Sequence, residues 1–372
     1  MSELKVNSIK GVGASTAAIT VNNTDGTCTA NITNRTNKNL ILNGACLIAQ
    51  RGTSSTSTGY QTVDRFKPYF TNTGNTVTQA QVDVASGTTP YTSGFRKALK
   101  MSMSGAGTVN ANTELYVQYR MEAQDLANSG WNYTSSSSNI TISFWVKAST
   151  NQTFYVRLFA ADTGNQTYVF SYTASGNDTW TKITKTIPGN SNLVINNDTG
   201  YGLSIIFYQF MGTDNTASRD LDTWANVSGN GTPDQASTWY AAGASTWEIT
   251  GLQVEVGSVS TDFEHRSFAQ ELELCKRYFQ FVPPTLGEAQ HSTNIQGCLT
   301  ASPAMRASPS CAIVIASNNL NLAGSGEKTC TSIGTLYYNS TQGGWAEMAG
   351  SSFSQYRNYY ILPNAFSFSA EL

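Results

Sequence analysis

The clearest pattern in the sequence is an alternation of apolar and polar residues with a period near two, which is typical of strands that bury one face. It recurs through residues 46–260 in segments bounded by Gly, Asn, Asp or Ser. These segments are Ile140–Val146, Phe154–Phe159, Tyr168–Tyr172, Trp180–Ile183, Leu203–Phe207 and Ile249–Val256. Strands at this spacing predict a sandwich of two sheets that share one core, and we assign it specifically as a jelly roll.

One later segment follows a helical period instead. Its apolar positions are Phe268, Leu272, Cys275 and Phe279. They are separated by four, three and four residues, which places them on one face of a helix. Ser267, followed three positions later by Gln270, has the form of a capping box. We therefore predict one short amphipathic helix within residues 261–280.

The two flanks of the chain differ from this central part. Residues 1–45 contain only short alternating pieces between Asn, Gly and Thr, and such strands cannot bury a core alone. We interpret them as an attachment or oligomerisation segment that docks on neighbouring chains, the alternative being a flexible tail. After Pro283-Pro284, residues 281–372 return to β composition and predict a small C-terminal β-domain. The expected fold class is thus all-β.

Composition supports this class and narrows the function. The chain has 372 residues with 18 Tyr, 16 Phe and 31 Gly, which favours strands and turns. Only 12% of residues are charged, the net charge is −2, and there is no run of Lys and Arg, so we expect no nucleic-acid partner. The start of the sequence lacks a signal-like apolar region and no apolar run is long enough for a bilayer, so we expect no membrane insertion.

The residues that usually carry chemistry do not form a recognisable catalytic or metal motif. The six cysteines are widely spaced and only two histidines occur, so we expect buried thiols and no metal site. His265 and His291 lie near no nucleophile motif, and the carboxylates around the predicted helix are spaced for ion pairs. Neither Gly11-Val12-Gly13 nor Gly324–Lys328 has the spacing of a phosphate-binding loop. We expect no enzyme activity and no cofactor.

The stretch between Phe210 and Thr246 has few apolar positions, and loops of this length in compact domains are usually functional or disordered. Aromatic rings can stack on sugar rings while carboxylates beside them bind hydroxyls. The predicted glycan-contact residues are Trp224, Trp239, Tyr240, Asp220 and Asp222. The alternative is that these rings fix the loop on the sandwich or on a neighbouring subunit. Asp214 with Asp220 and Asp222 does not match a calcium-loop spacing, and a solvated acidic loop is the better interpretation.

Several stretches resemble known proteins. They are Asn39–Gly44 continuing to Ala49–Gly52, Tyr60–Phe70, Ile142–Lys147, Trp247–Phe279 and the final Ala370-Glu371-Leu372. Together they resemble the tail-fibre and virion-appendage proteins of tailed bacteriophages. The resemblance implies a core similar to the jelly-roll domains of carbohydrate-binding modules, and a homotrimer.

These observations lead to one expected function and two alternatives. We expect a structural virion protein, assembled in the cytoplasm of a bacterial host. Its N-terminal segment would join other virion proteins, and its sandwich would attach a tail fibre or spike to host cell-surface polysaccharide. The first alternative is a head-fibre or decoration protein of the capsid. The second is a depolymerase spike, which needs a groove with paired carboxylates that the sequence does not display.

Overall fold

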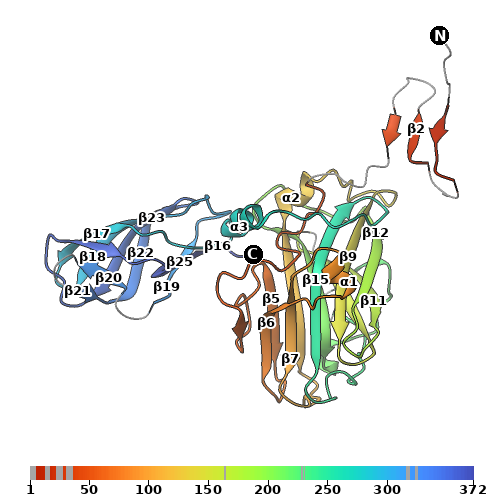
Figure 1. The fold of residues 1–372 in the computed structure, drawn as a ribbon, viewed down its shortest axis with the longest axis horizontal. Helices are drawn as coiled ribbons and strands as arrows, with labels where there is room; N and C mark the ends of the chain where they lie inside the picture. The colour runs from red at the N-terminus through yellow and green to blue at the C-terminus, as the bar shows by residue number, and fades with distance from the viewer. Residues whose placement is uncertain are drawn as a thin grey trace, which may run out of the picture.

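The chain is almost entirely β-structure, as predicted. The computed structural model describes residues 6–12, 17–21, 28–30, 37–162, 165–227, 229, 231–315, 319–322 and 326–372. Figure 1 shows three parts in chain order, namely a small N-terminal sheet, a large sandwich and an elongated C-terminal domain. Every helix in these ranges is too short and too polar to cross a membrane.

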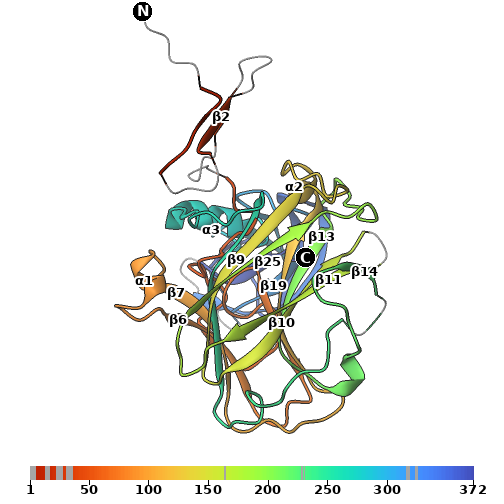
Figure 2. The ribbon, with the colours of Figure 1, turned by 90° about the vertical axis from the view of Figure 1, so that its right-hand side faces the viewer.

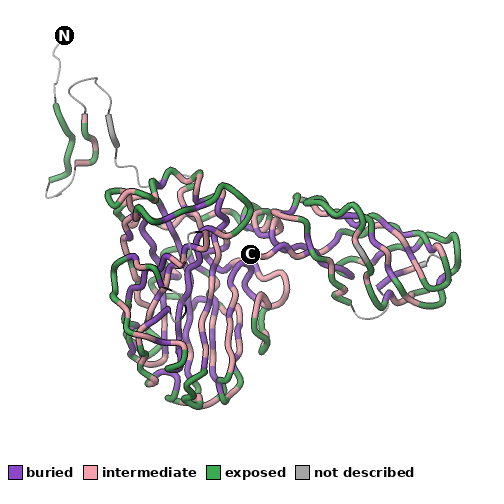
Figure 3. Tube along the Cα trace, turned by 180° about the vertical axis from the view of Figure 1, so that it is seen from behind, coloured by how far each residue is buried: buried purple, intermediate pink, exposed green. Residues whose placement is uncertain are grey.

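The N-terminal sheet stands away from the rest of the chain (Figures 1 and 2). Its antiparallel strands are β1 (Ser8–Ile9), β2 (Ile19–Val21) and β3 (Cys28–Ala30). Figure 3 shows that the described residues of β1 are exposed, and the side chain of Ile9 is 54% exposed. These strands are too short to form a core of their own, so Ile9 of β1 remains open to solvent and Ile19 and Val21 of β2 are only partly buried.

The sandwich consists of two six-stranded sheets. The first has the order β14-β11-β10-β13-β8-β5 and the second the order β12-β9-β15-β7-β6-β4. Their bounds are β4 Ser54–Ser55, β5 Phe66–Thr71, β6 Val77–Asp83, β7 Lys97–Met103, β8 Glu114–Glu122, β9 Asn139–Ala148, β10 Gln152–Ala160, β11 Gln166–Ala174, β12 Thr181–Pro188, β13 Tyr201–Met211, β14 Trp224–Asn226 and β15 Thr246–Val256. All six predicted strand segments are found, and the fold is the predicted jelly-roll sandwich.

The inner faces of the two sheets share a single apolar core because alternate residues of each strand point inward. Phe144 of β9 packs edge-on against Phe207 of β13, with the ring centres 5.1 Å apart. Trp247 of β15 is fully buried in the same cluster. Two short helices, α1 (Thr89–Thr92) and α2 (Ala123–Ala127), and the 3₁₀ turn η1 (Thr213–Asn215) lie between strands.

Residues 37–45 pack on the sandwich, although the sequence placed them in the N-terminal segment. Ile41 is fully buried in the sandwich core, and the side chain of Asn39 accepts hydrogen bonds from the backbone of Ile41 and Val254 at 3.0 and 3.1 Å. The Asn43 amide donates to the carbonyls of Ile48 and Asp64. Sequence patterning missed this docking because the partners lie far away along the chain.

The predicted helix is α3 (Phe268–Lys276), and its capping box between Ser267 and Gln270 is present. The prediction of its buried face was partly wrong, because Phe268 is 60% exposed. The helix instead buries Glu271 and Cys275. Glu271 is held by the backbone N–H of Asn43, so the docked 37–45 segment decides which side of the helix is covered.

The C-terminal domain is a second, smaller sandwich. One sheet has the order β16-β25-β19 and the other the order β21-β20-β24-β17-β18-β23-β22. The strands are β16 Phe279–Phe281, β17 Leu286–His291, β18 Asn294–Thr300, β19 Ser310–Ile313, β20 Leu320–Leu322, β21 Gly326–Lys328, β22 Cys330–Ser340, β23 Gly343–Gly350, β24 Asn358–Ile361 and β25 Phe366–Ser369. Its core includes Tyr359, Phe366 and Phe368, all fully buried.

The thiols are mostly buried, as predicted. Cys46, Cys275 and Cys330 are buried and reduced, whereas Cys298 is exposed on β18. Burial raises the pKa of the Cys46 thiol to about 12, which keeps it protonated and unreactive at neutral pH. The side chain of Cys28 lies outside the described residues.

Candidate functional site

The two aromatic residues at the end of the 211–245 loop lie in the core of the sandwich. Trp239 is fully buried, and its indole N–H donates to the carbonyl of Thr246 at 2.8 Å. The ring of Tyr240 is also fully buried and is stacked on Phe210 at 4.2 Å. A buried ring has no free face for a sugar, so the structure argues against Trp239 and Tyr240 as glycan-contact residues. Their role here is the alternative one, fixing the loop on the sandwich.

Trp224 and the predicted carboxylates have different surroundings. Trp224 opens β14 and is 9% exposed, with its indole N–H donating to the carbonyl of Pro188 at 2.7 Å. The Asp222 carboxylate is about half exposed and lies 2.6 Å from Lys185. Asp220 is exposed. In the described part of the chain no group of acidic, His or Cys side chains is arranged to hold a metal ion.

The loop also covers one end of the outer face of the first sheet. Gly231 lies against the Arg157 guanidinium, where a Cβ would come within 2.3 Å of that side chain. Thr232 beside it is fully buried. Asp222 donates its backbone N–H to the carbonyl of Val169 on β11 at 2.8 Å. The part of the face that stays accessible is therefore formed by outward residues of β5, β8 and β10, whereas the outward residues Ser204, Ile206 and Tyr208 of β13 between them are buried.

A row of four tyrosines crosses this accessible part. Tyr69 pairs with Tyr116, Tyr116 with Tyr208, and Tyr208 with Tyr155, so one tyrosine comes from each of four adjacent strands. Directly paired residues of antiparallel strands point to the same side of a sheet. Tyr69, Tyr116 and Tyr155 are half-buried, whereas Tyr208 is 3% exposed and forms the floor. We call this row the tyrosine face.

The rings of the tyrosine face pack on one another. Those of Tyr69 and Tyr116 are stacked with centres 5.1 Å apart, and that of Tyr116 meets Tyr208 edge-on at 5.9 Å. Burial and the nearby Glu114 carboxylate raise the pKa of the Tyr116 hydroxyl. Burial likewise raises the pKa of Tyr208. Both groups therefore stay neutral, so each hydroxyl keeps its ability to donate and to accept a hydrogen bond.

A second row, parallel to the tyrosines, supplies amide and cationic groups. Lys67 pairs with Gln118, Gln118 with Ile206, and Ile206 with Arg157. The Arg157 guanidinium donates to the Thr167 hydroxyl at 3.1 and 3.3 Å, which fixes its orientation. Burial, with Arg120 nearby, lowers the pKa of Lys67. Rings and hydrogen-bonding groups thus alternate across the same surface.

The pattern of residues along the chain does not single out the tyrosine face. Each tyrosine occupies an outward position of an alternating strand, where aromatic residues are common for packing reasons alone. The signal lies in the cross-strand register, which brings residues 69, 116, 208 and 155 together in an order that differs from the chain order.

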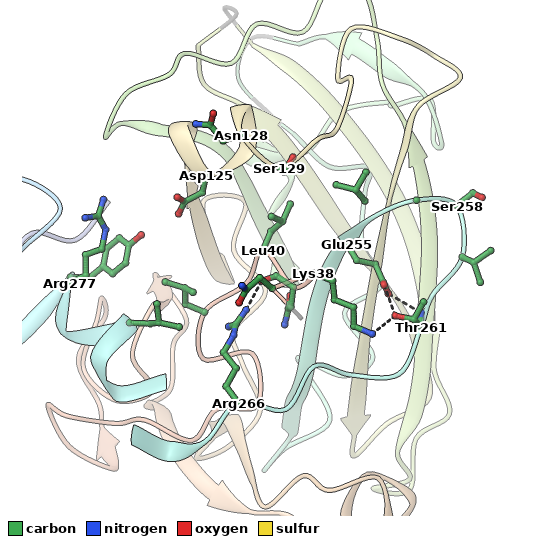
Figure 4. Close-up of a pocket in the computed structure, with 18 residues that line it drawn as sticks. Lys38, Leu40, Asp125, Asn128, Ser129, Glu255, Ser258, Thr261, Arg266 and Arg277 are labelled. Carbon is green, nitrogen blue, oxygen red and sulfur yellow. Dashed lines mark hydrogen bonds between the residues drawn. The ribbon is translucent and has the colours of Figure 1, made fainter. Parts of the chain in front are cut away.

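A groove of about 820 Å³ opens at the end of the sandwich, where residues 37–42, α2, the end of β15 and α3 meet (Figure 4). Most of its polar groups are engaged in local contacts. Lys38 donates to the Thr261 hydroxyl at 2.5 Å, and Arg266 donates to the carbonyl of Asn39 at 2.7 Å. The Glu255 carboxylate accepts from the Thr261 hydroxyl at 2.6 Å. These contacts hold residues 37–42 on the sandwich.

The carboxylates near this groove do not form a free pair. Glu122 is 1% exposed and accepts hydrogen bonds from Arg277 at 2.7 Å and from the Tyr278 hydroxyl at 2.8 Å. Partial burial and the neighbouring Glu122 raise the pKa of Asp125. A glycosidase needs one carboxyl group to act as acid and a second one facing it with its oxygens available. Here the oxygens of Glu122 already accept hydrogen bonds from Arg277 and Tyr278. The polar groups around the groove therefore hold neighbouring segments of the chain together.

Comparison with known proteins yields only distant structural likenesses. No protein-family profile matches the chain. No curated protein matches it either. Among solved structures, the enzymatically active domain of tailspike protein 4 of bacteriophage CBA120 is similar over 59% of this chain at 9% identity and a TM-score of 0.30, with only 21% of the tailspike chain covered.

Two further likenesses are to carbohydrate-binding modules. The family 11 module from Clostridium thermocellum, solved with a β-1,3-1,4-mixed-linked tetrasaccharide, covers 57% of this chain and 98% of the module at 13% identity and a TM-score of 0.26. The N-terminal cellulose-binding domain of Cellulomonas fimi β-1,4-glucanase C covers 57% and 99% at 12% identity and a TM-score of 0.27. The class that the fold itself defines is an all-β protein with a jelly-roll sandwich.

Proposed function

We propose that this chain is a non-enzymatic subunit of a bacteriophage particle that attaches the particle to a glycan of the host cell surface. The observation that carries the glycan part is the tyrosine face. The phage part rests on the sequence resemblance of Asn39–Gly52, Tyr60–Phe70, Ile142–Lys147 and Trp247–Phe279 to tail-fibre and appendage proteins. A tail fibre or spike is the assignment that uses both observations.

The tyrosine face has the chemistry that sugar recognition requires. Half-buried phenol rings offer flat apolar surfaces for the C–H faces of a sugar, and their hydroxyls reach its edges. Lys67 and the side-chain oxygen of Gln118 add hydrogen bonds to hydroxyl groups along the parallel row. The Gln118 nitrogen, in contrast, already donates to Ser204 at 2.8 Å, and the Arg157 guanidinium is held by Thr167 and covered by Gly231. Because the rings pack on one another, little side-chain freedom is lost on binding.

Such an open face binds weakly, and assembly compensates for this. A dissociation constant of about 1 mM corresponds to roughly −4 kcal/mol, and linking several sites raises overall attachment by orders of magnitude. The proposal includes a homotrimer whose N-terminal segment also joins other virion proteins. The support is that β1–β3 stand apart from the body and leave Ile9 and Val12 exposed, so they need partner chains.

The glycan part is tested with variants that remove rings from the tyrosine face. Tyr69→Ala and Tyr155→Ala are compared with Tyr91→Ala, a half-buried tyrosine of α1 outside this face. Binding of each full-length variant to purified host surface polysaccharide is measured by surface plasmon resonance. We expect the two face variants to bind at least tenfold more weakly than wild type and Tyr91→Ala to bind unchanged. Wild-type affinity in both face variants would reject the tyrosine face.

The particle part is tested separately. Electron cryo-microscopy of intact particles gives the position and stoichiometry of the subunit. Threefold spikes on the tail are expected, whereas sites spread over the shell would indicate a capsid decoration protein. Incubation of the purified protein with host polysaccharide is expected to release no reducing ends, and their release would indicate a depolymerase.

A further inference from the structure

The large sheet of the C-terminal domain leaves one face uncovered. Its inner face packs on the β16-β25-β19 sheet through buried residues such as Ile295, Met348 and Ile361. The residues that alternate with these point to the other side. They are exposed to solvent, and they include large apolar and aromatic side chains. Contiguous exposed apolar surface of this kind usually marks a binding site.

The exposed side chains form one straight row across six strands. Asn321 pairs with Tyr360, Tyr360 with Leu286, Cys298 with Trp345, and Trp345 with Tyr337. The β17 and β18 register, in which Gly287 pairs with Gly297, places Leu286 opposite Cys298 and completes the row. We call it the C-terminal row. At the usual spacing between strands, six strands span about 24 Å.

The rings of the C-terminal row are open to solvent. Tyr337 and Tyr360 are each 46% exposed, Trp345 is 41% exposed and Leu286 is 57% exposed. At one end, a depression of about 540 Å³ is lined by Leu286, Asn321, Asn358, Tyr360 and Leu362. The amide side chains of Asn321 and Asn358 thus lie beside the exposed ring of Tyr360 in this depression.

A polar row runs beside the C-terminal row, two residues further along each strand. It consists of Asn358, Glu288, Gln296 and Glu347, which pair in that order across β24, β17, β18 and β23. The two rows are separated by two residues of strand, or about 7 Å. Amide and carboxylate oxygens therefore follow the line of rings for most of its length.

From this arrangement we infer that the outer face of the C-terminal domain is a second carbohydrate-binding site, for a linear neutral oligosaccharide lying along the C-terminal row. Tyr337, Trp345 and Tyr360 stack on sugar rings, and the polar row binds their hydroxyls. Glu288 and Glu347 repel uronic acids and sulfated sugars, which sets the neutral class. Interfaces between proteins are depleted in glutamate at their centre, and here two glutamates lie beside the middle of the row.

This site is separate from the tyrosine face, which lies on the other sandwich, and it stands without the glycan part of the proposed function. Side chains of either surface can be replaced without changing the residues of the other. The variants therefore report on them independently.

Cys298 provides a direct test, because its exposed thiol lies within the row between Leu286 and Trp345. Cys28 and the partly buried Cys311 are first replaced by Ser in the full-length protein, so that they cannot react. Apart from Cys298, the cysteines left are then Cys46, Cys275 and Cys330, which are buried. The rate at which Ellman's reagent labels Cys298 is measured with and without 10 mM of each neutral hexasaccharide of glucose, mannose, galactose and N-acetylglucosamine. We expect at least one hexasaccharide to slow labelling fivefold or more. The inference is overturned if none of them slows it.

Ring-removal variants complete the test. Trp345→Ala and Tyr360→Ala are expected to weaken binding of the protecting hexasaccharide at least tenfold by isothermal titration. Tyr356→Ala, which replaces a 72% exposed tyrosine outside the row, is expected to leave it unchanged. Unchanged affinity in both row variants would overturn the site. So would slow labelling without sugar that speeds up on dilution, because it would show that a second copy of the chain covers the face.

Discussion

The Arg65 guanidinium lies 2.5 Å from the carboxylate of Glu371, and this contact joins the start of the sandwich to the last residues of the C-terminal domain. Both side chains are almost completely buried. Arg65 also donates to the carbonyl of Arg120 at 2.8 Å and lies over the ring of Tyr278 at 3.5 Å. Arg51 approaches the same carboxylate at 3.1 Å. The two domains are thus held together by a buried ionic network.

Removing the cation from this network should destabilise the protein strongly. Arg65→Met leaves Glu371 buried with one cation fewer, and breaking a buried pair costs about 3–5 kcal/mol. Urea unfolding of Arg65→Met measures the loss. Arg96→Met is the control, since Arg96 is a surface residue near Tyr91, and it should change the free energy of unfolding by less than about 0.5 kcal/mol. Equal stability of the two variants would contradict a structural role for the Arg65 contact.

The two kinds of residue in the 211–245 loop should respond differently to alanine. Trp239→Ala empties a fully buried site and is expected to cost about 3–5 kcal/mol of unfolding free energy. Asp222→Ala removes a half-exposed ion pair with Lys185, which is worth about 0–1 kcal/mol, and places Ala at a backbone φ of 64°, which adds at most about 1–2 kcal/mol. Thermal unfolding of both variants checks this. If Trp239→Ala unfolds as wild type does but loses glycan binding, the sequence-based assignment of Trp239 is restored.

Gln209 is expected to be a site of easy stabilisation. It is fully buried, and neither atom of its amide has a hydrogen-bond partner among the described residues. Gln209→Met keeps the length of the side chain and removes the unpaired polar group, which should stabilise the fold by about 1–2 kcal/mol. Gln152→Met is the matched control, because the side-chain oxygen of Gln152 accepts from the backbone N–H of Trp239 at 2.7 Å, while only its Nε2 has no hydrogen-bond partner among the described residues. That variant should lose stability, and a loss in Gln209→Met as well would show that Gln209 has a partner.

Glu271 should make stability depend on pH. Burial raises its pKa above the unfolded value, despite the backbone N–H of Asn43 and the Arg266 cation, so folding favours the protonated form. Its favourable contribution is complete below the unfolded pKa and is lost as the pH rises through the folded pKa. Glu271→Gln resembles the protonated form at every pH. The melting temperature of Glu271→Gln minus that of wild type should therefore increase between pH 4 and pH 7, and a constant difference would exclude the raised pKa.

Local sequence features determined much of the fold. The strands of the sandwich follow from alternation, and α3 begins directly after Ser267 because a capping box joins only residues three positions apart. The buried thiols of Cys46 and Cys275 also follow from composition and spacing. Such features depend on neighbours along the chain, so they can be read without knowing the fold.

Only the tertiary structure decided which aromatic residues are available for binding. Trp239 and Tyr240 resembled an exposed patch in a polar loop, yet long-range packing of Trp239 on Phe154 and of Tyr240 on Phe210 places them in the core. The tyrosine face and the C-terminal row each consist of residues that are far apart in sequence and are aligned by strand register. Register is fixed by which strands pair and by the need to bury one face of each, and this is a property of the assembled sheets that no single stretch of sequence specifies.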